Sequence, residues 1–252
     1  MSFWSYVLLG GMLVLSGMVD AISGGGGLIS ISAYLMAGLS PHVAIATNKL
    51  GALAGSITSN YRFIRNRMVD FSFVLPCIIV SVVGSLIGTN ISMNTDEATL
   101  MTVMIIILPI AAFLVLDDKL FNDRGSSEIQ KDRRTILTAM LCSFIVSIYD
   151  GFYGPGVGTF YLLAFTIFLK LKVKVANAQV KFIGLFSTAV SFVTFLMNGQ
   201  VAIGIGIYAI ICNMIGSYIG AGMVMKNGMK VAKPSIILVL VLLAVKFVTD
   251  QF

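Results

Sequence analysis

Charged side chains are scarce in this sequence of 252 residues. Asp, Glu, Lys and Arg together make up 11% of it, whereas about 25% is usual in soluble proteins. Hydrophobic residues account for 58%, and apolar stretches follow one another from end to end. This scarcity excludes an ordinary soluble domain. The chain is predicted to be an all-α polytopic membrane protein with a single transmembrane domain over residues 1–252.

Histidine and cysteine are also rare, which limits the chemistry that the chain can perform. His42 is the single histidine and is expected to be an ordinary residue near an outer loop, with pH sensing as the alternative. A serine triad needs a histidine at its centre, and zinc needs clustered His, Cys or carboxylate ligands. Cys77, Cys142 and Cys212 lie at unrelated positions in apolar segments. The sequence therefore predicts no disulfide framework, no metal site, no cofactor and no enzymatic activity.

The net charge of +6 does not indicate nucleic-acid binding. Nearly all Lys and Arg residues lie in short loops between apolar segments, where cytoplasmic basic residues of membrane proteins are expected. The first apolar stretch, residues 1–19, lacks a positively charged start. It is therefore predicted to be the first span and not a cleaved signal.

Ten apolar segments can be marked along the chain. Their approximate limits are 3–22, 26–39, 42–61, 70–93, 99–116, 135–153, 157–169, 175–197, 200–224 and 234–249. A helix needs roughly 20 residues to cross a bilayer core of about 30 Å, and most of these segments supply them. The two short segments, 26–39 and 157–169, are predicted to be half-helices or steeply placed short helices.

The chain divides into two similar halves. The most charged linker, 117–134, separates them and is predicted to be cytoplasmic. The hexapeptide VGSLIG at 83–88 matches IGSYIG at 215–220, an offset of 132 residues (215 − 83). We therefore expect two structural repeats, over residues 1–116 and 135–252.

Loop charges predict that the two repeats face opposite ways. The loop after the third segment holds Arg62, Arg65 and Arg67, while its counterpart at 198–200 has no charge. In two further pairs the second half is the basic one, because 170–174 is rich in lysine where 39–42 has no Lys or Arg, and 226–233 is rich in lysine where 94–97 is acidic. By the positive-inside rule the repeats are then inverted, with five crossings each and both termini outside. If the short segments were re-entrant, the repeats would instead be parallel.

Each half contains a glycine-rich interruption. A glycine in a helix interior costs roughly 1 kcal/mol relative to alanine, so these runs predict broken helices. In lipid such a break is tolerated only where it is buried in protein or lines a cavity. The runs lack the Lys-Ser/Thr ending of a nucleotide-binding loop. The glycines predicted to bind a small ligand are Gly24, Gly25, Gly26, Gly27, Gly154, Gly156 and Gly158.

Four charged residues remain inside apolar segments, namely Asp20, Lys49, Asp150 and Lys181. Each costs roughly 2.5–3.5 kcal/mol at a helix centre, so they are expected to face the interior and to pair or bind something. The helices that follow the glycine breaks begin with unpaired N–H groups, which favour an anion. Two lysines and two such helix starts predict a dry, positive pocket for a small oxyanion.

Polar residues beside the lysines add hydrogen-bonding capacity to the predicted pocket. They are Thr47, Asn48, Asn177 and Gln179. One alternative is that Asp20 pairs with Lys49, and Asp150 with Lys181, only to neutralise charge and fix the fold. Another is that the two aspartates carry protons, because an apolar setting favours a neutral carboxyl.

Four motifs stand at these residues, GGGGLISI at 24–31, GLSPHVAIATNK at 38–49, GFYGPGVGT at 151–159 and NGQV at 198–201. In these motifs the sequence resembles the TauE/SafE sulfite exporter family. The resemblance extends over essentially the whole chain. It implies a multi-pass protein of a prokaryotic plasma membrane that moves sulfite, organosulfonates or related sulfur anions. It also supports Asn48, Lys49 and the glycine loops as the site.

The functional prediction is a transporter of small anions that works by alternating access. One alternative is an anion channel with the same pocket, and another is a membrane accessory protein or enzyme of sulfur metabolism. The predicted partners are the anionic substrate, the lipid bilayer and a second copy of the chain in a homodimer. No nucleic-acid partner is predicted.

Overall fold

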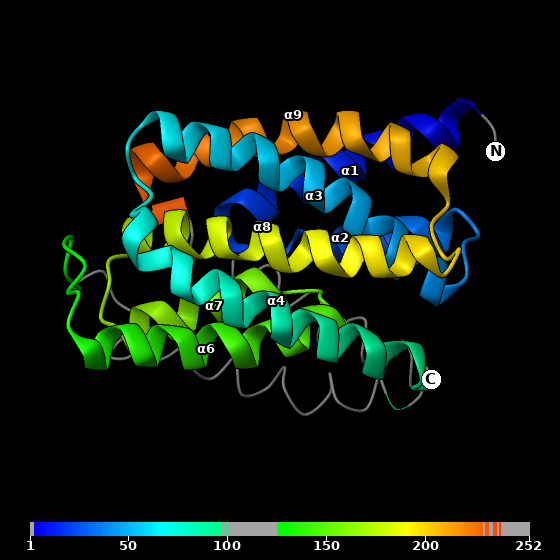
Figure 1. Cartoon of the computed structure of the whole chain (residues 1–252). Helices are drawn as coiled ribbons and strands as arrows, with labels where there is room; N and C mark the ends of the chain where they lie inside the picture. The colour runs from blue at the N-terminus through cyan, green and yellow to red at the C-terminus, as the bar shows by residue number, and fades with distance from the viewer. Residues whose placement is uncertain are drawn as a thin grey trace.

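The computed structural model describes residues 3–96, 99, 125–228, 230–231, 234–235 and 237. Of the predicted segments, 99–116 and 234–249 therefore lie almost entirely outside the described residues. The described part is helical and contains no strand. Its helices, shown in Figure 1, are α1 (Phe3–Ser23), α2 (Gly26–Met36), α3 (Pro41–Arg65), α4 (Phe71–Met93), α6 (Arg133–Phe152), α7 (Val157–Ile167), α8 (Val173–Met197) and α9 (Ile203–Asn227).

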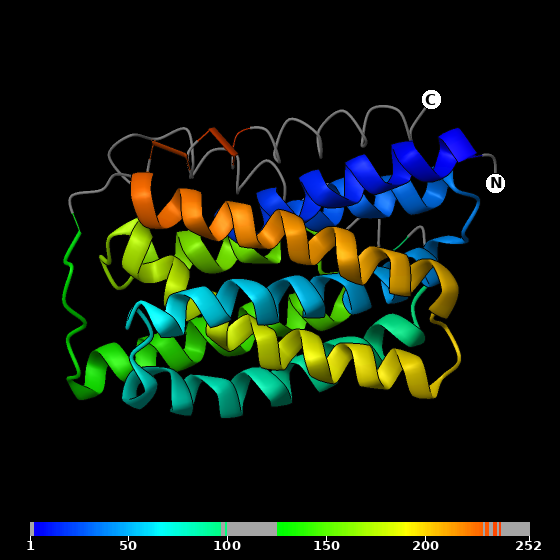
Figure 2. The ribbon, with the colours of Figure 1, turned by 90° about the horizontal axis from the view of Figure 1, so that it is seen from above.

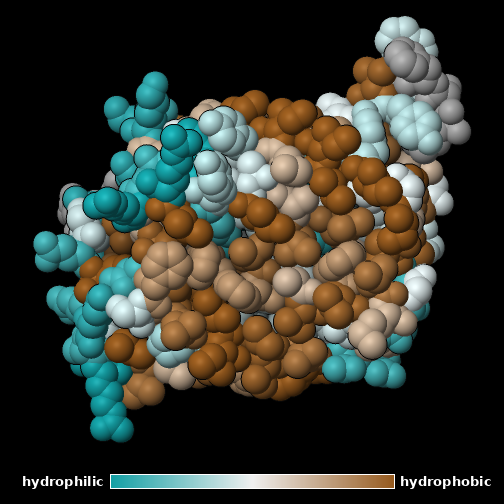
Figure 3. Space-filling view, turned by 45° about the horizontal axis from the view of Figure 1, so that its top comes forward, coloured by the Kyte–Doolittle hydropathy of each residue, from teal (hydrophilic) through white to brown (hydrophobic). Residues whose placement is uncertain are grey.

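Five of the described helices, α1, α4, α6, α8 and α9, are long and apolar enough to cross a membrane. Large hydrophobic side chains such as Leu75 and Ile79 of α4 and Leu141 and Ile145 of α6 are exposed on their outer faces. Figure 3 shows hydrophobic side chains over most of one face of the molecule. Exposed apolar surface of this extent suits contact with lipid. The predicted class, an all-α polytopic membrane protein, is confirmed.

The helix boundaries follow from local chemistry. Helix α3 begins at Pro41 after Ser40, and proline is well suited to the first turn because its missing N–H would be unpaired there. Asp70 caps α4 by accepting a hydrogen bond from Phe73 N, and Asp132 caps α6 in the same way from Thr135 N. These capping bonds satisfy N–H groups that the helix itself cannot pair.

Both predicted helix breaks are present. Gly24 between α1 and α2, and Gly154 and Gly156 between α6 and α7, have positive φ values of 79°, 91° and 78°. This left-handed region costs glycine nothing but strains other residues. The helices that follow, α2 and α7, have 11 residues each, which gives a length of about 16 Å. Each is therefore only about half of a bilayer core in length.

Corresponding helices of the two halves pack in a reciprocal pattern. Helix α1 packs along α9, α4 packs along α6, and α3 lies against α8. In Figures 1 and 2, α1, α3 and α9 run toward the left end of the molecule, whereas α6, α8 and α4 run away from it. Each of these helices thus runs opposite to its counterpart in the other half.

Glycines permit the close packing of these helix pairs. A Cβ added to Gly84 or Gly88 of α4 would overlap backbone atoms of α6. A Cβ added to Gly216 or Gly220 of α9 would overlap backbone atoms of α1. Small residues four positions apart let helix backbones approach. The hexapeptides that revealed the internal similarity are therefore helix contacts.

The basic loops gather at one end of the molecule. The α3–α4 turn, residues 125–132, the α7–α8 connection and the end of α9 lie at the left in Figure 1, where Figure 3 shows hydrophilic side chains. Ser126 N donates to Lys170 O at 2.8 Å, and Lys172 N donates to Ser126 O at 2.9 Å. The backbone thereby ties the linker between the halves to the basic loop before α8.

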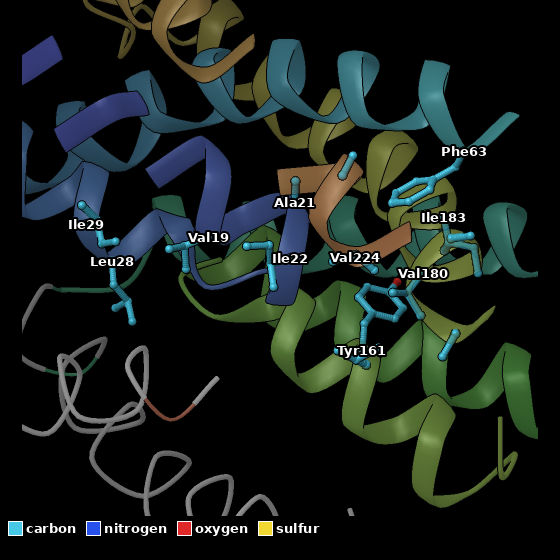
Figure 4. Close-up of a cluster of buried hydrophobic side chains, with 14 of the residues drawn as sticks. Val19, Ala21, Ile22, Leu28, Ile29, Phe63, Tyr161, Val180, Ile183 and Val224 are labelled. Carbon is cyan, nitrogen blue, oxygen red and sulfur yellow. The ribbon is translucent and has the colours of Figure 1, made fainter. Parts of the chain in front are cut away.

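The buried core lies where the two halves meet. Figure 4 shows Val19 and Ile22 of α1 with Val180 and Ile183 of α8 and Tyr161 of α7. All five side chains are buried. An apolar core from both halves therefore surrounds the end of α1 and the middle of α8, where charged residues also lie.

Candidate functional site

The two glycine breaks touch each other at the centre of the molecule. Gly158 N donates a hydrogen bond to Gly24 O at 3.3 Å, and Thr159 Oγ1 donates to Ser23 O at 2.8 Å. A Cβ on either glycine would overlap the backbone of the other. Only glycine allows this approach, so the sequence of the breaks positions the two halves against each other.

Two ion pairs, one buried and one partly buried, join the halves beside this contact. Lys49 Nζ lies 2.6 Å from Asp150 Oδ1, and Lys181 Nζ lies 2.7 Å from Asp20 Oδ2. The alternative that Asp20 pairs with Lys49 and Asp150 with Lys181 is therefore wrong. Because the breaks cross, the aspartate that ends the first helix of each half reaches the lysine helix of the other half.

A cavity of about 50 Å³ lies between the ion pairs and the glycine breaks. A cavity needs roughly 10–15 Å³ to hold one water molecule, so this one has room for a small ion with little water. The predicted site residues that line it are Asp20, Gly24, Gly27, Asn48, Lys49, Asp150, Gly154, Gly158 and Lys181. The structure thus brings together charged, polar and glycine residues from both halves.

The charges of the cavity correct one expectation. We expected a dry, positive pocket, but each ammonium group faces a carboxylate within hydrogen-bond distance. The two lysines and two aspartates are the charged residues among those that line the cavity, and their formal charges sum to zero. The pocket is therefore polar and neutral, because burying four charges is tolerable only when they are paired.

Asn48 is oriented by a neighbour on the helix after the first break. Ser30 Oγ of α2 donates a hydrogen bond to Asn48 Oδ1. The Nδ2 atom of Asn48 then lies 3.3 Å from the position of a Cβ on Gly27. The amide is held with its donor beside the glycine loop, where it can reach a ligand in the cavity.

Other predicted site residues lie outside the cavity lining and support the fold around it. Thr47 Oγ1 accepts from Ala202 N at 3.0 Å, and Gln179 Oε1 accepts from Asp70 N at 3.0 Å. The two bonds are equivalent in the two repeats, because Gln179 follows Thr47, and Ala202 follows Asp70, by 132 residues. Helix α3 thereby holds the turn between α8 and α9, and helix α8 holds the turn between α3 and α4.

Asn177 has a similar supporting role. Its Nδ2 donates to Ala21 O at 3.1 Å and to Ile22 O at 3.2 Å, where α1 nears its end. The remaining glycines of the prediction, Gly25, Gly26 and Gly156, are likewise absent from the cavity lining. These residues shape the breaks without facing the space between them.

Several cavity residues were not predicted from the sequence. Ser56 and Thr188 follow Lys49 and Lys181 by seven residues, which is two helical turns on the same face. Helical spacing from the lysines could have identified both. Asn213, on α9, also lines the cavity, and no local pattern connects it to the charged residues.

Comparison with known proteins gives consistent matches over nearly the whole chain. A model of the sulfite exporter TauE/SafE family matches residues 8–247. A probable membrane transporter protein of Haemophilus influenzae is 32% identical over 234 residues, covering 92% of this chain and 90% of that protein. The probable membrane transporter protein YfcA of Escherichia coli K12 is 32% identical over 239 residues, covering 94% and 87%. No solved structure matches the chain significantly.

Proposed function

Because this chain belongs to the sulfite exporter TauE/SafE family and is a membrane transporter, we propose that it moves small sulfur oxyanions, sulfite or organosulfonates, across a prokaryotic plasma membrane. The observation that carries the proposal is the cavity between the two halves. It holds two lysine ammonium groups and the glycine breaks of both halves. A sulfite or sulfonate group presents three oxygens that accept hydrogen bonds, and an ammonium group has three N–H donors.

The cavity offers hydrogen-bond donors that can replace those of the water molecules that an anion gives up on binding. Lys49 Nζ uses two donors on Asp150, one to Oδ1 and one to the backbone O, both at 2.6 Å. Its third N–H remains for a ligand. The Nδ2 donor of Asn48 lies beside the same space, and the breaks precede the N-terminal ends of α2 and α7. Helix N-termini favour anions because their first N–H groups have no intrahelical partner.

Alternating access is the mechanism that we propose for this site. Counterpart helices run in opposite directions in Figures 1 and 2, which supports an inverted repeat. In transporters of that plan, one repeat rocks against the other around a site near the membrane midplane. Here the halves meet at Gly24 and Gly158 and through two ion pairs. The basic end of the molecule would face the cytoplasm.

Counterflow in proteoliposomes tests the proposal. The purified protein is reconstituted, and uptake of labelled sulfite or methanesulfonate is measured with and without the same unlabelled anion inside. A carrier is accelerated by internal substrate, whereas an anion channel is not. A chemical product distinct from the added anion would instead favour an enzyme of sulfur metabolism. Absence of uptake for both anions would contradict the proposed substrates.

A further inference from the structure

The neutrality of the cavity sets a condition on anion binding. Two lysines and two aspartates already balance each other, so a bound monovalent anion would leave one uncompensated negative charge. An unpaired charge is costly to bury in apolar surroundings. One proton taken up together with the anion would restore the balance, and one of the two carboxylates is the natural acceptor.

Asp150 is poorly placed to accept that proton. Its side chain is 2% exposed, and both carboxylate oxygens already accept hydrogen bonds, Oδ1 from Lys49 and Oδ2 from Ser187. Lys49 also donates to the backbone O of Asp150. Protonation of Asp150 would displace at least one of these donors inside the core. The Lys49–Asp150 pair therefore has no free carboxylate oxygen for a proton.

Asp20 differs from Asp150 both in the exposure of its side chain and in the hydrogen bonds that its carboxylate accepts. Its side chain is 21% exposed, and Oδ2 accepts from Lys181. No described residue donates to Oδ1. The difference has a cause in the sequence, because the position equivalent to Ser187 at the offset of 132 is Gly55, which has no hydroxyl. Asp20 thus keeps one oxygen open toward the cavity that it lines.

We propose, on the basis of the anion transport inferred above, that Asp20 takes up a proton as the anion binds and thereby releases Lys181 to the anion. Lys49 stays paired with Asp150 and offers only its remaining N–H. In this exchange the proton goes to Asp20, the Lys181–Asp20 ion pair opens, and a Lys181–anion ion pair replaces it. One proton then accompanies each monovalent anion.

Among the charged groups that line the cavity, Lys181 is the one that is paired with Asp20. The other titratable residues of the lining are Lys49 on α3, Asp150 on α6 and Tyr161 on α7. Lys49 and Asp150 are bonded to each other, and the Tyr161 hydroxyl lies 3.1 Å from Ser143 O. The lining residues of α2 and α9 carry no titratable side chain.

Carbodiimide labelling of the wild-type protein tests the inequality of the two aspartates without a substrate. Dicyclohexylcarbodiimide takes the proton of a neutral carboxyl and bonds to its oxygen, and the adduct rearranges to a stable N-acylurea. Peptide mass spectrometry then measures modification at each aspartate over a range of pH. We expect modification of Asp20 to rise as the pH falls and to exceed that of Asp150 several-fold. Equal labelling, preference for Asp150 or no labelling of Asp20 would overturn the proposal.

Methanesulfonate binding measures the coupling itself, with D20N as the variant and wild type as its reference. A sulfonate keeps its single charge over the pH range used. Uptake of one proton makes wild-type affinity rise by up to about tenfold for each pH unit lowered, whereas D20N, neutral at every pH, should bind with little pH dependence. Equal pH dependence in both proteins would refute the role of Asp20. If wild type binds no sulfonate, the proposed sulfonate substrate fails, and the labelling still decides on Asp20.

Discussion

Lys49 and Lys181 occupy equivalent positions in the two halves, but they differ in the hydrogen-bond acceptors around them. Lys49 has two acceptors on Asp150, while Lys181 has one on Asp20. Removing one partner of a buried ion pair leaves the other charge uncompensated, which typically costs 3–5 kcal/mol. A variant of one lysine alone therefore changes both the stability and the function of the protein, and the two effects must be separated.

Lys49→Ala is expected to abolish anion transport while the protein still reaches the membrane, because Asp150 keeps its bond to Ser187. Transport in proteoliposomes and protein amount in membranes are the two measurements. The double variant K49M/D150N serves as a control for stability, since it removes the pair without leaving a buried charge. We expect it to melt nearer to wild type than Lys49→Ala and yet to remain inactive. Wild-type transport in either variant would show that Lys49 is only structural.

At the scale of elements, the crossing of the glycine breaks determines how α2 and α7 are placed. Gly24 and Gly158 are in backbone contact, with no room for a Cβ on either. Glycines on the packed faces of α4 and α9 have the same constraint. By contrast, a Cβ on Gly204 of α9 would meet nothing within 4 Å.

Gly158→Ala should therefore reduce transport strongly and lower thermal stability, because the added methyl group separates the two breaks. Gly204→Ala is the matched control, since it makes the same chemical change in a helix without a steric conflict. It should leave transport unchanged and stabilise slightly, by up to roughly 1 kcal/mol from helix propensity. Equal effects of the two substitutions on transport rate and melting temperature would contradict the role of the crossing.

The start of α4 offers a second prediction at this scale. Asp70 caps the helix and lies 2.8 Å from Lys131 of the linker. Burial raises the pKa of Asp70, but hydrogen bonds from Lys131 and Ser72 outweigh it and hold this pKa below its ordinary value. Asp70→Ala should cost about 1 kcal/mol of stability through the lost cap.

The pH dependence of that loss follows from the direction of the shift. A carboxyl with a lowered pKa stabilises the folded state above its ordinary pKa, and the contribution disappears as the pH falls through the lowered value. The difference in melting temperature between wild type and Asp70→Ala should thus be full near neutral pH and shrink only in strong acid. Glu128→Ala, an exposed change in the linker, is the control. A difference that grew on acidification would be inconsistent with this assignment.

At the scale of the whole molecule, the loops define two ends of different character. The basic loops gather at one end, and the α2–α3 and α8–α9 connections lie at the other. Ser40 before α3 and Ser127 in the linker are exposed at these opposite ends. Under the proposed inverted topology the linker faces the cytoplasm and the α2–α3 connection faces outward.

Cysteines introduced at these two serines test the orientation. In a background without Cys77, Cys142 and Cys212, which are free thiols in the structure, we expect a membrane-impermeant thiol reagent to label Ser40→Cys in intact cells. Ser127→Cys should react only after the cells are opened. Labelling of both positions from outside, or the reverse pattern, would argue against the proposed topology.

Much of the architecture could be predicted from the sequence because its causes are local. The described spans match the predicted segments within a few residues, and both helix breaks occur at the glycine runs. The cost of charge in an apolar segment singled out Asp20, Lys49, Asp150 and Lys181, and all four meet at one cavity. The repeat offset also identified equivalent positions before any contact between the halves was known.

The helices, the breaks and the identity of the buried charges follow from the order of the residues alone, since each depends on residues near in the chain. The packing of the two halves, in contrast, sets the pairing of Asp20 with Lys181 and of Asp150 with Lys49, which makes the pocket neutral. It also places Thr47 and Gln179 outside the pocket, where they hold turns. These outcomes depend on how two halves, more than 100 residues apart in the chain, cross at Gly24 and Gly158. Charge pairing is set by distance in space, and no local pattern encodes it.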